Sequence, residues 1–242
     1  MAYAIAVSDN IYAIKTHLFL GTDVLYDTIK DFGITSNINN NVSLALGTSE
    51  VYLNELTNAY CKISSMGKDI KSSYINKIIN KDKKIIYQKN ANFSQKYNSD
   101  TCFLLAEAMT NIFDNRLRYN ISPTGASVSA KLSKTYAAKT GSTDYDNWMI
   151  GFNNKITLGI WTGYDDNKII NNKETRFMKY IWADIMEEYN KIYSNTWYTV
   201  PTNIIGIKLN PINGQIALDD EYSKYLYFKY NNLPNYPYLN QY

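Results

Sequence analysis

Apolar residues recur at intervals of three and four along several parts of the chain, which is the spacing of an amphipathic helix. This pattern predicts helices over five segments, at about 9–20, 23–32, 49–63, 99–113 and 174–193. Gly21 separates the first two segments, and Gly33 ends the second. Between the fourth and the fifth predicted helix lies a stretch, at about 135–164, in which the spacing of apolar residues is not helical.

Two of the helices have an apolar face that the spacing identifies. In the first helix it consists of Ile11, Ile14 and Leu18, and in the last it consists of Phe177, Ile181, Ile185 and Tyr189. An apolar stripe of this kind is usually the face that a helix turns toward the core. We therefore expect both faces to be buried.

Strands are predicted in two regions. Residues 69–88 alternate around a turn at Lys81–Lys84, which predicts a hairpin. Three further strands follow at Thr135–Thr140, Trp148–Phe152 and Ile156–Tyr164, and the last two are joined by a tight turn. The combination indicates an α/β protein of the α+β kind, with an antiparallel sheet and helices packed on it.

Composition narrows the possible functions. The 242 residues are 45% hydrophobic and carry 25 basic and 22 acidic residues, for a net charge of +3. Basic and acidic residues are interspersed, so we expect no nucleic-acid partner. With one histidine and two cysteines, Cys61 and Cys102, we expect neither a metal cluster nor a disulfide framework, and no cofactor. No apolar run reaches membrane-spanning length.

A short polar run ends the first of the three strands. Lys139, Thr140, Gly141 and Ser142 present an ammonium group, two hydroxyl groups and a residue without a Cβ. Beside a cleft, the ammonium supplies charge, the hydroxyls donate hydrogen bonds, and a ligand can lie along the backbone at the glycine like an added strand. The run predicts an anion-binding site, although Lys-Thr-Gly is a common tripeptide that also occurs at solvated strand ends.

A second polar run, Ser8-Asp9-Asn10, lies at the turn into the first predicted helix. A serine there can cap the helix or face a cleft. Ser-x-Asn followed by Lys-Thr-Gly forms the second and third elements of the active-site set of penicillin-binding proteins and class A β-lactamases. The chain resembles, in order, the transpeptidase domain of a bifunctional (class A) penicillin-binding protein at Ser8–Gly21, Ser43–Glu50, Ala137–Ser142, and from Asp146–Trp148 through Gly163–Asp166.

The resemblance implies a penicillin-binding protein/β-lactamase-like transpeptidase fold with a helical subdomain. It assigns residues 1–196 to the transpeptidase domain and 197–242 to a C-terminal extension. The implied activity is peptidoglycan cross-linking through a serine ester formed on D-Ala-D-Ala stem peptides. The implied partners are stem peptides and β-lactams, and the implied location is the extracytoplasmic face of the bacterial membrane, with a membrane-anchored parent protein.

The resemblance also implies a role for each site residue. Ser8 relays a proton toward the leaving amine, and Lys139 keeps the local potential positive; these are the implied catalytic residues. The implied substrate-binding residues are Asn10, Thr140, Gly141 and Ser142. Asn10 bonds the substrate amide, and Thr140 and Ser142 donate to the terminal carboxylate. Gly141 leaves room for the ligand along the backbone, and the Ser142 N–H is one of the two implied oxyanion donors.

One element of the family set is missing. The only Ser-x-x-Lys runs from Ser65 to Lys68, and Gly67 predicts a turn there instead of the start of a buried helix. Glu50 begins a chance match to the Glu-x-x-Leu-Asn of β-lactamases, and we interpret it as the N-terminal residue of a helix. We expect a C-terminal piece of a transpeptidase that lacks its nucleophile and is inactive alone. A non-catalytic module that binds peptidoglycan or β-lactams, and a serine β-lactamase, are the alternatives.

Overall fold

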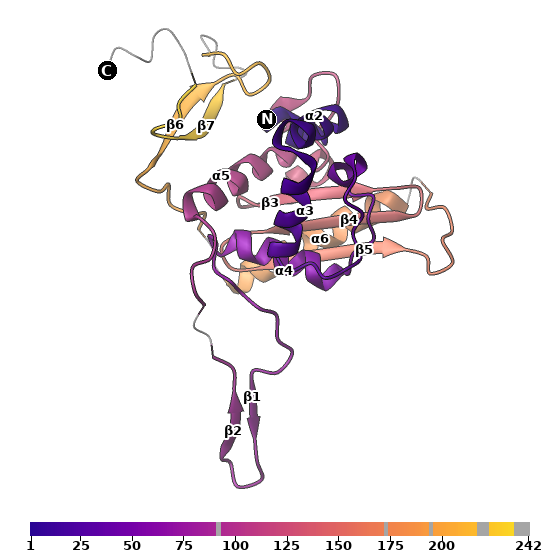
Figure 1. Cartoon of the computed structure of the whole chain (residues 1–242), viewed down its shortest axis with the longest axis vertical. Coiled ribbons are helices and arrows are strands. Elements are labelled where there is room, and N and C mark those ends of the chain that lie inside the picture. The colour runs from indigo at the N-terminus through magenta and orange to yellow at the C-terminus, as the bar shows by residue number, and fades with distance from the viewer. Residues whose placement is uncertain (91–92, 172–173, 194–195, 217–222, 235–242) are drawn as a thin grey trace.

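A three-stranded antiparallel sheet lies at the centre of the computed structural model, which describes residues 1–90, 93–171, 174–193, 196–216 and 223–234 (Figure 1). Its strands are β3 (Ala137–Ser142), β4 (Asp146–Phe152) and β5 (Thr157–Gly163), in that order. The three predicted strands are confirmed, with bounds that differ by one or two residues. Since β3 pairs only with β4 among the described residues, its other edge has no strand partner.

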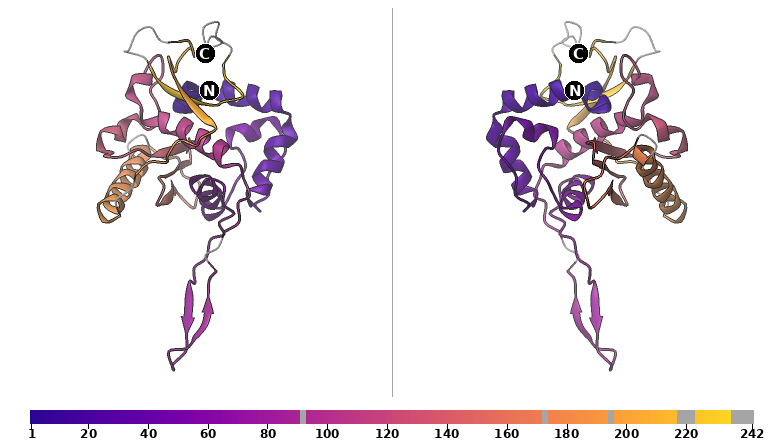
Figure 2. Two further views of the ribbon diagram at one scale, coloured as in Figure 1. Left: turned by 90° about the vertical axis from the view of Figure 1, so that its left-hand side faces the viewer. Right: turned by 90° about the vertical axis from the view of Figure 1, so that its right-hand side faces the viewer.

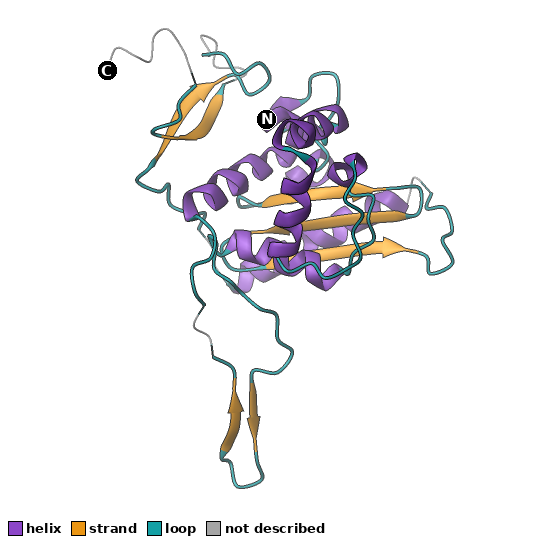
Figure 3. Ribbon diagram, in the orientation of Figure 1, coloured by secondary structure: helices purple, strands orange, loops and turns teal. Residues whose placement is uncertain are grey.

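Helices cover the sheet and extend beyond it (Figure 3). They are α1 (Ala2–Val7), α2 (Asn10–Leu20), α3 (Thr22–Asp31), α4 (Leu53–Ser64), α5 (Ser99–Thr110) and α6 (Glu174–Ile192). Short 3₁₀ turns occur at Val42–Leu46, Asn111–Phe113, Asn115–Leu117 and Ala126–Lys131. The five predicted helices are confirmed, whereas α1 was not predicted because six residues are too few to show a helical period.

The two faces of the sheet have separate cores. On one face, Trp182 of α6 packs with Ala138 and Met149. On the other, Ala137 and Phe152 pack with α5 residues such as Ala106. This division follows from the alternation of side chains along a strand. It places α6 on one side of β3–β5, and α4 and α5 on the other.

The buried face of α6 differs from the predicted one. Phe177, Ile181 and Ile185 are 61%, 46% and 41% exposed. The buried residues are Met178, Trp182, Ala183 and Met186, one position further along the helix. The helix therefore has two adjacent apolar stripes, and helical spacing alone cannot choose between them. Trp182 decides the orientation because its ring fits over Gly151, where a Cβ would lie 2.5 Å from the ring atom Cζ2.

The predicted face of α2 is also wrong. Ile11 and Leu18 are 67% and 54% exposed, while His17 is 4% exposed. The His17 ring lies against the 3₁₀ turn that follows Asn41, with Nε2 3.4 Å from the Asn41 carbonyl oxygen. His17 is thus a packed residue.

The predicted hairpin forms a projecting arm. Strands β1 (Lys77–Ile79) and β2 (Ile85–Gln88) pair with each other and with no other described strand. Figure 2 shows the arm extending well away from the rest of the chain. Its base is held by a bridge between Lys68 and Gln95.

The C-terminal region contains a second hairpin, β6 (Ile204–Leu209) and β7 (Lys224–Lys229). It packs on α5 through an edge-to-face contact between the rings of Phe103 and Tyr227. Trp197 lies earlier and donates a 2.5 Å hydrogen bond to Glu107 of α5. The division into residues 1–196 and 197–242 stays a prediction, and residues 235–242, which hold much of the aromatic end, lie outside the described part.

Candidate active site

The site brings together two segments that are remote in sequence. Lys139 Nζ on β3 donates a 2.7 Å hydrogen bond to Ser8 Oγ, across 131 positions. The same ammonium group donates to the carbonyl oxygen of Thr140 at 2.8 Å. The Ser-x-Asn and Lys-Thr-Gly segments therefore meet in the fold.

Ser8 occupies an uncommon backbone conformation. It ends α1 with φ 56° and ψ 53°, in the left-handed region that non-glycine residues seldom adopt. Asp9, not Ser8, caps α2, because its carboxylate accepts the Tyr12 N–H at 2.9 Å. The capping role considered for Ser8 is thus filled by its neighbour. The Ser8 hydroxyl is left to face Lys139.

Lys139 is largely removed from water. Burial lowers the pKa of its ammonium group from 10.5 to about 8. None of the described acidic side chains forms an ion pair with it; its partners are the Ser8 hydroxyl and a carbonyl oxygen. An incoming carboxylate would therefore meet a cation whose charge has no local counterion.

Three of the other predicted binding residues, Thr140, Gly141 and Ser142, lie on β3. Asn10 is exposed in the first turn of α2. Alternation puts Lys139 and Gly141 on one face of the strand and Thr140 and Ser142 on the other. A ligand running along the outer edge of β3 could be contacted from both faces, whereas one lying on a single face could not.

Gly141 allows a direct test of this edge. A Cβ built there meets only Trp148 Cβ, at an ordinary 3.6 Å, so packing within the chain does not require glycine. We expect Gly141→Ala to change the free energy of unfolding by less than about 1 kcal/mol. If a ligand lies beside Gly141, the added methyl group would crowd it, and the variant should lose β-lactam affinity or acylation rate in a protein carrying the complete site. A stable variant with unchanged β-lactam reaction would remove Gly141 from the proposed binding surface.

Sequence reasoning missed the residues that hold α1 in place. The Thr124 N–H donates to the Ala6 carbonyl oxygen at 2.9 Å, two residues before Ser8. Lys179 of α6 donates to the Thr124 carbonyl oxygen at 2.7 Å, and burial lowers the pKa of its ammonium group. No sequence signal marks these residues, because both contacts use backbone atoms of Thr124.

The two misleading matches lie away from this site. Ser65 ends α4 and donates to the Lys62 and Lys68 carbonyl oxygens, so the Ser-x-x-Lys segment is a turn, as predicted. Glu50 is exposed and precedes α4, which begins at Leu53, so its interpretation as a helix N-terminal residue is wrong.

Within the described part of the chain, no group of three or more His, Cys, Asp or Glu side chains could hold a metal ion. There too, no helix has the length and apolarity needed to cross a bilayer.

Sequence relatives and solved structures that resemble this chain belong to the same family. No protein-family model matches the chain. Penicillin-binding protein 2D of Bacillus subtilis is 41% identical over 212 residues, which cover 87% of this chain and 31% of that protein. Penicillin-binding protein 1A of Rickettsia typhi is 31% identical over 245 residues, covering 93% and 31%. The chain thus spans about a third of the length of these relatives.

Solved structures share the fold at low sequence identity. Penicillin-binding protein 1A of Haemophilus influenzae has a TM-score of 0.84 at 17% identity, over 98% of this chain and 41% of that chain. PonA1 of Mycobacterium tuberculosis, solved in complex with penicillin V, has a TM-score of 0.69 at 18% identity, over 83% and 58%. The fold is therefore that of the transpeptidase domains of penicillin-binding proteins. With the sequence relatives, it places the chain in the penicillin-binding protein family.

Proposed function

We propose that this chain supplies the proton relay and the substrate-binding edge of a serine D,D-transpeptidase that cross-links peptidoglycan. The observation that supports the proposal most directly is the 2.7 Å contact between Ser8 and the half-buried Lys139, on a strand whose outer edge pairs with none of the described strands. We further propose that the same edge binds β-lactams, at the extracytoplasmic face of the membrane.

In the proposed reaction, a serine of the parent protein bonds to the carbonyl carbon of the penultimate D-Ala. The bond to the terminal D-Ala breaks, and its amine leaves with a proton passed through Ser8. An amine of a neighbouring stem then attacks the ester, forms the cross-link and releases the serine. Lys139 favours the terminal carboxylate and the negative charge that develops on the carbonyl oxygen. Thr140 and Ser142 are proposed to donate to the carboxylate, and Asn10 to the substrate amide.

A binding function without turnover is the second candidate. Its support is that the one Ser-x-x-Lys in this sequence lies in a turn, where Ser65 bonds to backbone carbonyl groups. For the transpeptidase, the first candidate, we propose instead that a further Ser-x-x-Lys segment of the parent protein supplies the nucleophile. A serine β-lactamase has no observation in its favour.

The 242-residue chain alone should form no covalent adduct with a fluorescent penicillin. A serine becomes a nucleophile through a base and an oxyanion site held in fixed geometry, and Ser65 has neither. Incubation with excess drug, followed by intact-mass measurement, checks this. Stoichiometric acylation would show that the chain contains its own nucleophile, and peptide mapping would identify it. Adding the Ser-x-x-Lys segment of the family in the same polypeptide should restore acylation, and its failure to do so would count against the transpeptidase proposal.

A further inference from the structure

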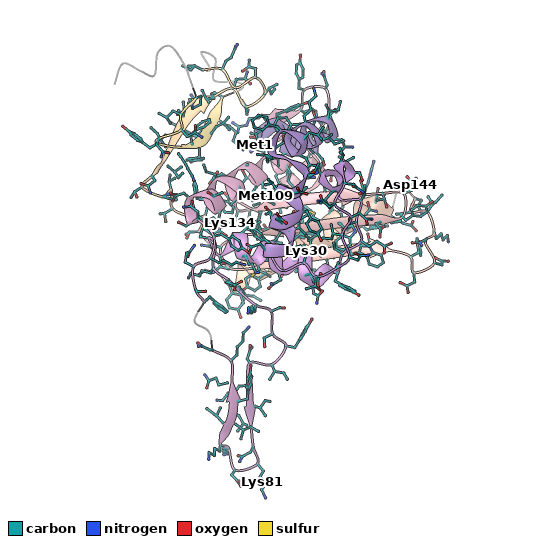
Figure 4. The ribbon with its side chains drawn as sticks, viewed as in Figure 1. Met1, Lys30, Lys81, Met109, Lys134 and Asp144 are labelled. Atoms are coloured by element: carbon teal, nitrogen blue, oxygen red, sulfur yellow. The ribbon has the colours of Figure 1, made fainter. Side chains whose placement is uncertain are left out.

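The net positive charge of the chain comes from the projecting hairpin. Residues 70–90, called the basic arm below, contain six lysines and one aspartate, for a net charge of +5. Since the whole chain has a net charge of +3, the remainder has a net charge of −2. The expectation that basic and acidic residues are interspersed is therefore wrong for this stretch, because its lysines are close in sequence and the hairpin holds them on one thin ribbon, with Lys81 at its tip (Figure 4).

The charge of the basic arm is not neutralised by the protein. Among the described residues, none of its six lysines forms an ion pair. Lys89 donates to the Lys71 carbonyl oxygen at 3.1 Å, and its ammonium group lies 5.9 Å from the Phe93 ring centre. Six ammonium groups on an isolated ribbon repel one another, so an anionic ligand would stabilise the arm.

The apolar residues of the arm pair across its two strands. Ile78 pairs with Tyr87 and Ile79 with Ile85 across the ribbon, and such pairs hold strands together. A two-stranded hairpin is nevertheless marginally stable in water. Tyr74, at the base of the arm, is 89% exposed and has a free ring face.

We propose that the basic arm binds the acidic stem peptides of a glycan strand, at a second site outside the acyl-transfer site. The proposal rests on the proposed function, which makes such a polymer the substrate. Lysine ammonium groups match the stem carboxylates, and the Tyr74 ring can lie against a sugar ring. Because the polymer is extended, one strand can contact both the arm and the edge of β3.

A bilayer fits the arm less well than this polymer. The apolar pairs lie in the middle of the ribbon, and the turn beyond them carries Lys81, Asp82, Lys83 and Lys84. Inserting the middle end-on would draw these charges into the lipid, which is costly. A second copy of the arm is excluded as a partner by its like charge.

Co-sedimentation with purified peptidoglycan free of other wall polymers tests the arm. Replacing Lys81, Lys83 and Lys84 together by glutamine should weaken binding about tenfold or more, and raising the salt concentration should weaken wild-type binding as the charges are screened. The matched control replaces Lys15, Lys134 and Lys155, which are exposed on the body and have the same total charge, and should bind as wild type. Equal binding by both triple variants would overturn the proposal.

Two further ligands separate the alternatives. Glycan strands stripped of stem peptides by an amidase should bind at least tenfold more weakly, and retained binding would rule out the stem carboxylates as the ligand. Vesicles of anionic phospholipid should bind more weakly than peptidoglycan, and tighter binding would assign the arm to the membrane. Lys139→Ala should keep arm-dependent binding, so loss of the arm site and loss of the acyl-transfer site give distinguishable results.

Discussion

Lys139→Ala, in a protein that carries this chain together with the Ser-x-x-Lys segment, is expected to slow acylation by penicillin about 100- to 1,000-fold. The substitution removes the ammonium group that faces Ser8 and the proposed carboxylate and oxyanion positions, and loss of such a group costs this much in comparable sites. Acylation rate and thermal midpoint should be measured on the same samples. Lys134→Ala, an exposed lysine just before β3, is the control and should react normally.

The thermal midpoint should fall little or even rise in Lys139→Ala, because the folded protein bears the cost of a poorly solvated ammonium group. This cost gives a pH test. The pKa of Lys139 is about 8 in the folded protein, whereas the unfolded chain has the ordinary value of 10.5. Between pH 8 and pH 10.5 the unfolded chain therefore binds more protons than the folded protein. The stability of the native protein should therefore rise, relative to Lys139→Ala, as the pH goes from about 8 to about 10. A constant difference across this range would mean that Lys139 is hydrated, and a large fall in midpoint with normal acylation would make it a structural residue.

Trp182→Ala is expected to cause the largest loss of stability, about 3–5 kcal/mol in the free energy of unfolding. Its side chain is fully buried in the core between α6 and the sheet, and its indole N–H donates to the Leu158 carbonyl oxygen at 3.1 Å. Truncation would leave a cavity above Gly151 and an unpaired carbonyl oxygen. Urea unfolding followed by circular dichroism measures the loss.

Phe177→Ala is the matched control on the same helix. Phe177 belongs to the stripe that helical spacing predicts to be buried, yet its side chain is 61% exposed. Its truncation should cost no more than about 0.5 kcal/mol. A larger loss for Phe177 than for Trp182 would restore the predicted face of α6.

The sequence by itself determined most of the helices and strands, and the family. Period-two alternation and turn residues located β3, β4 and β5 to within two residues, because strand signals are local. The order of the Ser-x-Asn and Lys-Thr-Gly segments identified the family that the relatives support. The turn predicted at Gly67 is confirmed, and the Ser65 hydroxyl there bonds to the Lys62 carbonyl oxygen.

Only the tertiary structure decided which faces are buried and what surrounds each charge. α6 has two apolar stripes of similar strength, and the fit of Trp182 over Gly151 selects one of them. His17, not Ile11, is buried on α2 because a distant 3₁₀ turn packs there. Burial lowers the pKa of Lys139, and its ammonium group contacts Ser8, which lies 131 positions away in the sequence. Local periodicity reports what a residue can bury, whereas burial and solvation depend on contacts between segments that the linear order does not specify.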